Sequence, residues 1–319
     1  MLQSEPIVIS ISIREFVESI FLQGDLFFAK SLQNVMQEGI QIHKNWQNIQ
    51  QEQDENYSSE IPLFYEYKTN DFLFQFTGRM DGLIIRKNQY YVEEIKSTVL
   101  PLESISESTF PVHWAQAKCY AFMYAHEKQK AKMNVIVTYY QKETGETRQF
   151  QKSYTYQSLL TFFHSLVHQY EKSILQEYQW QIHRNESIEK LTFPFSSYRK
   201  GQQDLIDSVQ GATQNGDILF AQAPTGIGKT MAVLFATLKS IPETGLSKVF
   251  YLTARTPTQK VAEKALQLLQ QNGLQYRCIT LAAKEKVCLM GLPHCIGDEC
   301  PYAKGYYDRI NDAINTLLE

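Results

Sequence analysis

Eight residues, 223–230, constrain the fold of this 319-residue chain more than any other segment. They read Ala-Pro-Thr-Gly-Ile-Gly-Lys-Thr and connect an apolar segment, 217–222, to an amphipathic segment, 229–240. Glycines let a loop close around anionic oxygens, and the N–H groups at the start of a helix attract phosphate. The sequence therefore predicts a phosphate-binding loop, in which Lys229 reaches the β and γ phosphates of ATP and the Thr230 hydroxyl binds Mg²⁺. The expected nucleotide contacts in the loop are Thr225, Gly226, Ile227, Gly228, Lys229 and Thr230.

Predicted strands and helices alternate around this loop. The predicted helices are 199–212, 229–240 and 256–271, and the predicted strands are 217–222, 248–253 and 276–281. Such alternation is typical of a parallel α/β sheet. We therefore predict an α/β domain over residues 191–319, an incomplete P-loop (RecA-like) domain with a parallel sheet.

The first half of the chain predicts another α/β unit. Short segments rich in aromatic and β-branched residues predict strands at 63–67, 72–76, 81–86, 90–95 and 135–140, with a hairpin turn at 87–89. Apolar spacing predicts helices within 12–53 and at 113–128 and 156–178. The polar stretch 183–189 interrupts the pattern, so we place a boundary near residue 190, between domains 1–190 and 191–319.

Three charged residues lie on the predicted strands of the first domain. Asp81 begins one strand, and Glu94 and Lys96 end the next on a single face, because side chains alternate along a strand. If the strands pair, the two carboxylates converge and can hold Mg²⁺ or Mn²⁺, which prefer oxygen ligands. The ion would polarise a scissile phosphate and activate a water, while Lys96 orients that water or neutralises charge. The pattern alone is weak, since any exposed hairpin can show it, and Glu93 replaces Glu94 if the register slips by one residue.

Four of the five cysteines lie within residues 278–319, namely Cys278, Cys288, Cys295 and Cys300. The segment around the last three has little apolar surface with which to order itself, so thiolates tied by zinc or an iron–sulfur cluster are the leading interpretation. Cys278 falls in a predicted strand and can equally be a core residue. His294 is a weak candidate for the fourth ligand, which can also lie beyond Glu319.

The phosphate-binding loop and its surroundings resemble the superfamily 2 helicases, in particular the XPD-like and DinG-like branch. Residues 198–202 (Tyr-Arg-Lys-Gly-Gln) resemble the element that lies near adenine in that branch, which implies that Gln202 contacts the adenine of ATP. Residues 251–259 resemble motif Ia, which touches the DNA backbone. The DNA contacts thus implied are Thr253, Arg255, Thr256 and Gln259. A [4Fe-4S] insertion follows motif Ia in this branch, and the ligands it implies are Cys288, Cys295, Cys300 and, doubtfully, Cys278.

Residues 35–125 resemble the RecB-like members of the PD-(D/E)XK nuclease superfamily. Within them, 39–43 (Gly-Ile-Gln-Ile-His) resemble a helix whose histidine joins the metal site. The resemblance implies that His43 is a metal ligand beside Asp81 and Glu94.

Residues 116–120 (Gln-Ala-Lys-Cys-Tyr) resemble the Q-x-x-x-Y motif of the same nucleases. Residues four apart share a helix face, so Gln116 and Tyr120 are implied to join Asp81, Glu94 and Lys96 at the catalytic site. Some RecB-like nucleases carry their own iron–sulfur cluster, but the only cysteine of this domain is Cys119, so we expect none here.

The two resemblances together imply an ATP-dependent DNA helicase fused to a metal-dependent DNA nuclease, acting on single-stranded or forked DNA in repair or processing. One rival is a non-catalytic DNA-binding module with a nuclease-like fold, and another is a DNA-independent P-loop ATPase with a structural zinc. No Asp-Glu-Ala-His type Walker B motif precedes Glu319. We therefore expect a fragment that binds nucleotide weakly at best and does not hydrolyse it at a helicase-like rate.

The composition limits location and partners. Lys and Arg total 31 and Asp and Glu total 34, so the formal charge is −3 and a globally basic, histone-like binder is excluded. The longest apolar runs are far shorter than the roughly 20 residues that a membrane span needs. The N-terminus lacks the basic region and cleavage site of a signal peptide. We expect a cytoplasmic protein that does not contact membranes.

Overall fold

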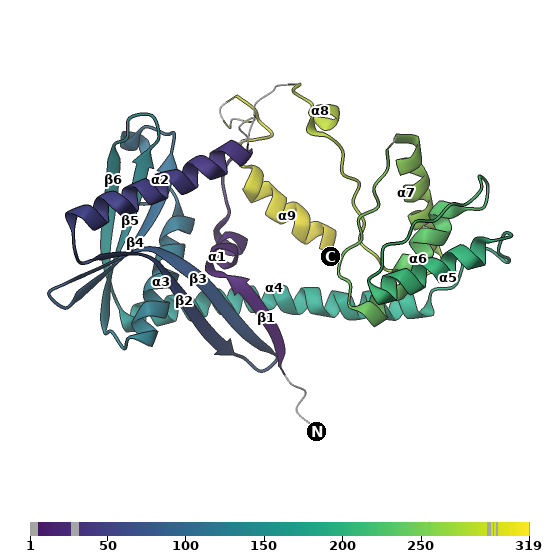
Figure 1. The fold of residues 1–319 in the computed structure, drawn as a ribbon, viewed down its shortest axis with the longest axis horizontal. Helices are drawn as coiled ribbons and strands as arrows, with labels where there is room; N and C mark the ends of the chain where they lie inside the picture. The colour runs from purple at the N-terminus through teal and green to yellow at the C-terminus, as the bar shows by residue number, and fades with distance from the viewer. Residues whose placement is uncertain are drawn as a thin grey trace. The chain divides into compact units, whose positions relative to one another are not determined.

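The structure is a computed structural model and describes residues 6–26, 32–254, 256–291, 295, 297 and 299–318. Its elements (Figure 1) are β1 (Ile7–Ser12), α1 (Ile13–Phe21), α2 (Leu32–Gln53), β2 (Tyr57–Lys68), β3 (Phe72–Arg86), β4 (Gln89–Thr98), a 3₁₀ turn (Leu102–Ser104), α3 (Pro111–Glu127), β5 (Lys132–Gln141), β6 (Thr147–Thr155), α4 (Tyr156–Lys190), α5 (Gln202–Asn215), α6 (Lys229–Thr244), α7 (Thr256–Gln271), α8 (Lys284–Val287) and α9 (Tyr306–Leu318). The chain is a mixed α/β protein.

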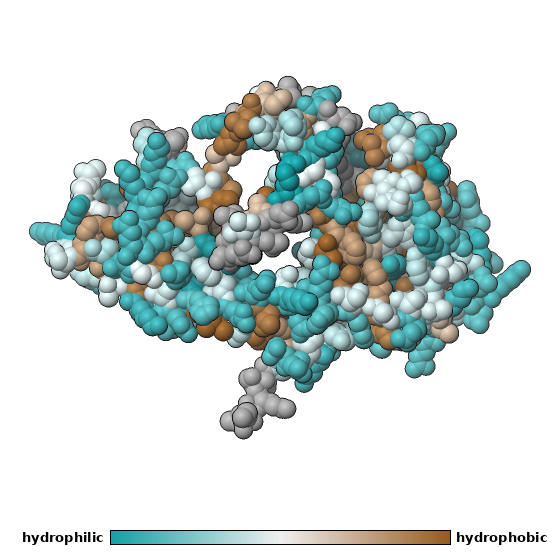
Figure 2. All heavy atoms as spheres, turned by 180° about the vertical axis from the view of Figure 1, so that it is seen from behind, coloured by the Kyte–Doolittle hydropathy of each residue, from teal (hydrophilic) through white to brown (hydrophobic). Residues whose placement is uncertain are grey.

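Two compact units share these elements. The first comprises Met1–Lys172 and Ala283–Glu319, and the second comprises Ser173–Ala282, so α4 contributes residues to both. On the face drawn in Figure 2, hydrophilic residues cover most of the surface and hydrophobic residues form smaller patches among them. No helix in the described part of the chain is both long enough and apolar enough to cross a membrane.

The first unit is built on a six-stranded mixed sheet. β2 follows one edge of β3 in antiparallel register along most of its length. The other edge of β3 is shared: β1 pairs with it in parallel up to Thr77, and β4 pairs with it antiparallel from Gly82 onward. β5 then pairs in parallel with β4, and β6 antiparallel with β5. Residues 78–81 therefore face a fork in the sheet, where β1 has ended and β4 has not yet begun to pair.

The structure confirms the predicted strands and helices of this unit, but it joins two predicted strands into one and adds two further strands. The predicted strands 72–76 and 81–86 are one continuous strand, β3, and Lys87 and Asn88 form the predicted turn with φ of 48° and 62°. The sequence analysis missed β1 and β6. In β6 the side chains are mostly polar and exposed, so this edge strand lacks the apolar alternation by which a strand is recognised.

Aromatic side chains from four elements form the core of the first unit. Phe16 of α1, Phe76 of β3, Phe122 of α3 and Phe163 of α4 have no exposed surface. Their rings contact one another, with centroids 4.6 Å apart for Phe122 and Phe163 and 4.8 Å apart for Phe16 and Phe76. This packing fixes α1, α3 and α4 against the strand that carries the fork.

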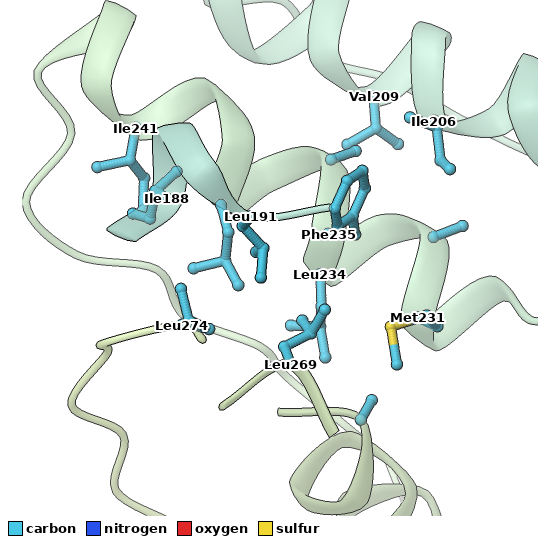
Figure 3. Packing of buried hydrophobic residues seen from close by; sticks show 14 of the residues in the cluster. Ile188, Leu191, Ile206, Val209, Met231, Leu234, Phe235, Ile241, Leu269 and Leu274 are labelled. Atoms are coloured by element: carbon cyan, nitrogen blue, oxygen red, sulfur yellow. The ribbon is translucent and has the colours of Figure 1, made fainter. Parts of the chain in front are cut away.

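The second unit is a cluster of helices. Buried side chains of α6, α7 and the end of α4, such as Leu234, Leu269 and Ile188, pack together (Figure 3). α4 continues to Lys190 where the sequence predicted an irregular connection at 183–189, because Ile188 is fully buried in this cluster. The position of the domain boundary stays a prediction.

The parallel sheet predicted for the second domain is not formed. Within the described residues of the second unit, the segments 217–222, 248–253 and 276–281 contain no strand. Val249 and Tyr251 pack against the helices, but Phe250 is 77% exposed and Leu252 is 89% exposed. Parallel strands occur where both faces are covered, and only one face of this segment has a cover.

Replacing Gly78 with alanine is expected to lower the free energy of unfolding by about 1–3 kcal/mol. A Cβ at this position, which lies at the fork, would overlap the ring of Tyr120. Gly39 in α2 is the matched control, because a Cβ there meets only the Ser97 Oγ at 3.8 Å. Gly39→Ala is expected to raise the free energy of unfolding by about 0.5–1 kcal/mol, since glycine weakens a helix. Urea unfolding measures both, and equal stabilities would contradict the overlap.

Candidate active site and nucleotide-binding loop

Asp81, Glu94 and Lys96 meet at the fork of the first sheet. Glu94 and Lys96 lie on one face of β4, and Lys96 Nζ lies 2.7 Å from Glu94 Oε1. The Asp81 carboxylate replaces the missing backbone partner: its Oδ2 accepts a hydrogen bond from the Ile95 N–H at 2.8 Å. The structure thus brings the three residues of the predicted catalytic motif together.

Two residues of α3 extend this cluster. Lys96 Nζ also donates to Gln116 Oε1 at 3.0 Å, and Gln116 Nε2 donates to the Tyr120 hydroxyl at 3.2 Å. Gln116 and Tyr120 lie one helical turn apart on the face that packs on the sheet. The lysine ammonium is therefore held between a carboxylate and an amide, and its position is well defined.

Helix α2 brings His43 to the same place. Its Nδ1 lies 3.6 Å from Asp81 Oδ1. The six residues predicted for the catalytic and divalent-metal site thus form two contacting groups, His43 with Asp81, and Glu94 with Lys96, Gln116 and Tyr120. The backbone N–H of Ile95, between Glu94 and Lys96, joins the groups through Asp81.

One carboxylate oxygen of Glu94 lacks a partner, although the other pairs with Lys96. Glu94 is 1% exposed, and its Oε2 is buried without a hydrogen bond. Burial raises the pKa of Glu94 to about 7, and the negative charge of Asp81 adds to the rise, while Lys96 opposes it. A cation at Oε2 would satisfy this oxygen and favour the ionised carboxylate.

The residues present fit a divalent ion held by two carboxylates. Asp81 and Glu94 supply oxygen ligands, which Mg²⁺ and Mn²⁺ prefer, and Mg²⁺ usually keeps several waters. A complete cage is not preformed, because the described part of the chain contains no group of three or more His, Cys, Asp or Glu side chains arranged to hold a metal ion. His43 as a third ligand stays a prediction.

The sheet register decides between Glu94 and Glu93. Glu93 is paired with Gly82 in the β3–β4 ladder, and its side chain accepts hydrogen bonds from Trp46 and Tyr57 rather than from Lys96. Glu94 is therefore the residue that faces Lys96. The sequence analysis missed Trp46, although its spacing of three residues from His43 is a signal that could have found it.

The phosphate-binding loop connects to α6 in the second unit. Gly226 and Gly228 have φ of 87° and 82°, which glycine adopts readily. The helix begins at Lys229, whose Nζ donates to the carbonyls of Ala223 and Pro224 at 2.9 Å each. The ammonium thus binds the carbonyls of its own loop.

A cavity of about 620 Å³ lies beside this loop, and its lining includes Arg199, Gln202, Gly226, Gly228, Lys229 and Thr230. Gln202 is 2% exposed and its Nε2 donates to the Gly228 carbonyl at 3.4 Å. A Cβ on Gly228 would meet that same amide at 2.5 Å, so the close approach requires glycine. Arg199, which the sequence analysis did not assign, donates to the carbonyl of Gly226.

The predicted DNA-binding residues are placed only in part. Thr253 precedes α7 and Gln259 lies within it, and both are partly exposed. Arg255 and the side chain of Thr256 lie outside the described residues. Their contacts with DNA stay predictions.

The cysteines do not form a metal site in the described part of the chain. Cys300 is buried, Cys288 and Cys295 are partly buried, and Cys278 is exposed. Cys278 is therefore not the core residue that its predicted strand suggested, because residues 277–281 are all exposed. His294 lies outside the described residues.

One family of known proteins matches a segment in the second half of the chain. Residues 199–296 match the family model described as DEAD/DEAH box helicase. A solved structure entitled "Crystal structure of SSO0001" is similar over 52% of this chain and 78% of that chain, with 14% sequence identity and a TM-score of 0.34. A search of curated proteins found no match. The helicase match includes Gln202 and the phosphate-binding loop, and it supports a member of helicase superfamily 2, a class of nucleic-acid-dependent ATPases.

Proposed function

We propose that this chain combines a metal-dependent DNA nuclease site in its first unit with the nucleotide-binding part of an XPD-like, ATP-dependent DNA helicase in its second. The observation that carries the nuclease proposal is the cluster of Asp81, Glu94 and Lys96 at the fork of the sheet. The family match and the cavity beside the phosphate-binding loop support the helicase part.

Phosphodiester hydrolysis needs an activated water and stabilisation of negative charge on the phosphate. A divalent ion on Asp81 and Glu94 would polarise the scissile phosphate and lower the pKa of a bound water. Lys96 is held by Glu94 and Gln116, so its positive charge lies where charge develops on the phosphate. Tyr120 in turn fixes the amide of Gln116.

Cleavage of single-stranded DNA by the purified chain tests the nuclease proposal. We expect cleavage with Mn²⁺ and none with EDTA. Cleavage that persists in EDTA would contradict a metal-dependent site, and binding without cleavage would favour a non-catalytic DNA-binding module.

An iron–sulfur cluster held by Cys288, Cys295 and Cys300 is part of the proposal and rests on their place after residues 251–259, which resemble motif Ia. Anaerobically purified protein is expected to be coloured and to contain iron. Colourless protein with zinc would replace this assignment with a structural zinc.

Replacing Lys229 with alanine is expected to weaken binding of Mg-ATP at least about tenfold, a loss of about 1.4 kcal/mol. The substitution removes the ammonium at the start of α6, which reaches the phosphates in the proposed complex. Titration with a fluorescent ATP analogue measures the affinity. Lys264→Ala, an exposed position on α7, is the control and should bind as the wild type does. Equal affinity for both variants would mean that the loop does not bind nucleotide.

A further inference from the structure

The inner face of α2 is attached to the sheet by three side chains. His43, Trp46 and Gln47 occupy positions i, i+3 and i+4, which are neighbours on a helix. His43 lies beside the Asp81 carboxylate, and Gln47 Nε2 donates to the main-chain carbonyl of Asp81 at 2.9 Å. Trp46 Nε1 donates to Glu93 Oε1 at 3.1 Å. The helix thus contacts both β3 and β4 at the candidate active site.

Glu93 is the buried end of this attachment. It is 1% exposed and accepts hydrogen bonds from Trp46 of α2, Tyr57 of β2, Thr138 of β5 and Gln149 of β6. A buried carboxylate is costly unless its oxygens accept hydrogen bonds. One side chain therefore contacts four elements besides its own strand.

The residue paired with Glu93 leaves room for this arrangement. Gly82 is its Cα partner in the β3–β4 ladder, and a Cβ on Gly82 would overlap the Tyr57 hydroxyl. That hydroxyl donates to Glu93 Oε2 at 2.8 Å. Burial and the Glu93 carboxylate both raise the pKa of Tyr57, so the hydroxyl keeps its proton and remains a donor.

We propose that Glu93 is a positioning residue, which fixes α2 on the sheet through Trp46 and so holds His43 beside Asp81. Glu93 and Glu94 are adjacent on a strand, so they point to opposite faces, and Glu93 lies on the face away from the proposed metal ligand Glu94. Its effect on cleavage rests on the proposed nuclease function. The attachment of α2 itself can be measured without any activity.

Hydrogen exchange of the metal-free full chain tests the attachment. Trp46→Phe removes the indole N–H and keeps an aromatic ring, and Glu93→Gln keeps the size and removes the charge. In both variants, peptides from 37–53 are expected to exchange at least about tenfold faster, while peptides from 72–98 keep their rates. Glu103→Gln, at an exposed position, is the control and should leave all rates unchanged. Unchanged exchange of α2 in both variants overturns the proposal, whether or not the chain cleaves DNA.

A double-mutant cycle tests whether the attachment acts through His43. Trp46→Phe is expected to lower kcat for Mn²⁺-dependent cleavage about tenfold and to change KM less than about twofold. In a His43→Ala background, Trp46→Phe should change kcat less than about twofold, because the His43 side chain that the attachment positions is already absent. Equal losses in both backgrounds overturn the role assigned to His43. If the wild type cleaves no DNA, the proposed nuclease function fails. The hydrogen-exchange rates still show whether Glu93 and Trp46 hold α2 on the sheet.

Discussion

Replacing Lys96 with alanine is expected to lower the rate of Mn²⁺-dependent DNA cleavage by about 100-fold or more. The side chain is 22% exposed, and its ammonium contacts Glu94 and Gln116. Alanine removes the positive charge that would stabilise the phosphate and also leaves the Glu94 carboxylate without its counter-ion. Single-turnover cleavage of labelled single-stranded DNA measures the effect.

Two further variants make this test specific. Lys128→Ala removes an exposed lysine that pairs only with its neighbour Glu127 at the surface, so cleavage should not change. Asp81→Asn keeps the size of the side chain, and its amide oxygen can still accept from the Ile95 N–H, but one metal-binding charge is lost. Its loss of activity should be at least as large as that of Lys96→Ala. If Asp81→Asn and Lys96→Ala both cleave at the wild-type rate, the active site lies elsewhere.

Cleavage at limiting Mn²⁺ is expected to fall about 100-fold between pH 7 and pH 5, that is, about tenfold for each pH unit. The pKa of Glu94 is about 7 without metal, because the side chain is buried and Asp81 lies nearby. Protons and the metal therefore compete for the same carboxylate below pH 7. Saturating Mn²⁺ should restore most of the rate at pH 5, and rates measured against Mn²⁺ concentration at each pH separate this competition from unfolding. A profile that is flat from pH 5 to 7 at limiting Mn²⁺ would show that Glu94 does not bind the ion.

Protonation of Glu94 lowers cleavage at limiting Mn²⁺, but it is expected to stabilise the metal-free protein. The pKa of Glu94 is about 7 in the folded state and near the ordinary 4.5 when unfolded. Between pH 4.5 and pH 7, Glu94 keeps its proton in the folded state but has released it in the unfolded state. The free energy of unfolding therefore falls as pH rises through this window, and the stabilisation present below pH 4.5 is lost by about pH 7. The expected slope is about 1.4 kcal/mol per pH unit, and Glu94→Gln should remove it. A free energy of unfolding that rises over this window in the wild type alone would contradict the assigned shift.

The sequence predicted which candidate side chains of the first unit lie on a common face, because the side-chain pattern of a strand or a helix is periodic. Alternation along a strand placed Glu94 and Lys96 on one face, and helical spacing placed Gln116 and Tyr120 together. The loop at 223–230 likewise depends on adjacent residues, and the structure places its glycines and lysine at the start of α6.

The periodic pattern of side chains does not indicate which distant segments pair with one another. No local signal indicates that β1 and β4 share one edge of β3, yet this fork is why the Asp81 carboxylate meets the Ile95 N–H. The segments predicted as strands of the second unit form no strand in the structure, for a related reason. A strand-like sequence forms a parallel strand only when other parts of a fold cover both of its faces.

Sequence alone indicated the candidate residues: two carboxylates, a lysine, and a glycine-rich loop that precedes a helix. Only the tertiary structure decided that Glu94 rather than Glu93 faces Lys96, and that Glu93 instead binds α2 to the sheet. The physical reason is register. A shift of one residue along β4 would exchange the two glutamates between its faces, and long-range pairing with β3 and β5 fixes that choice.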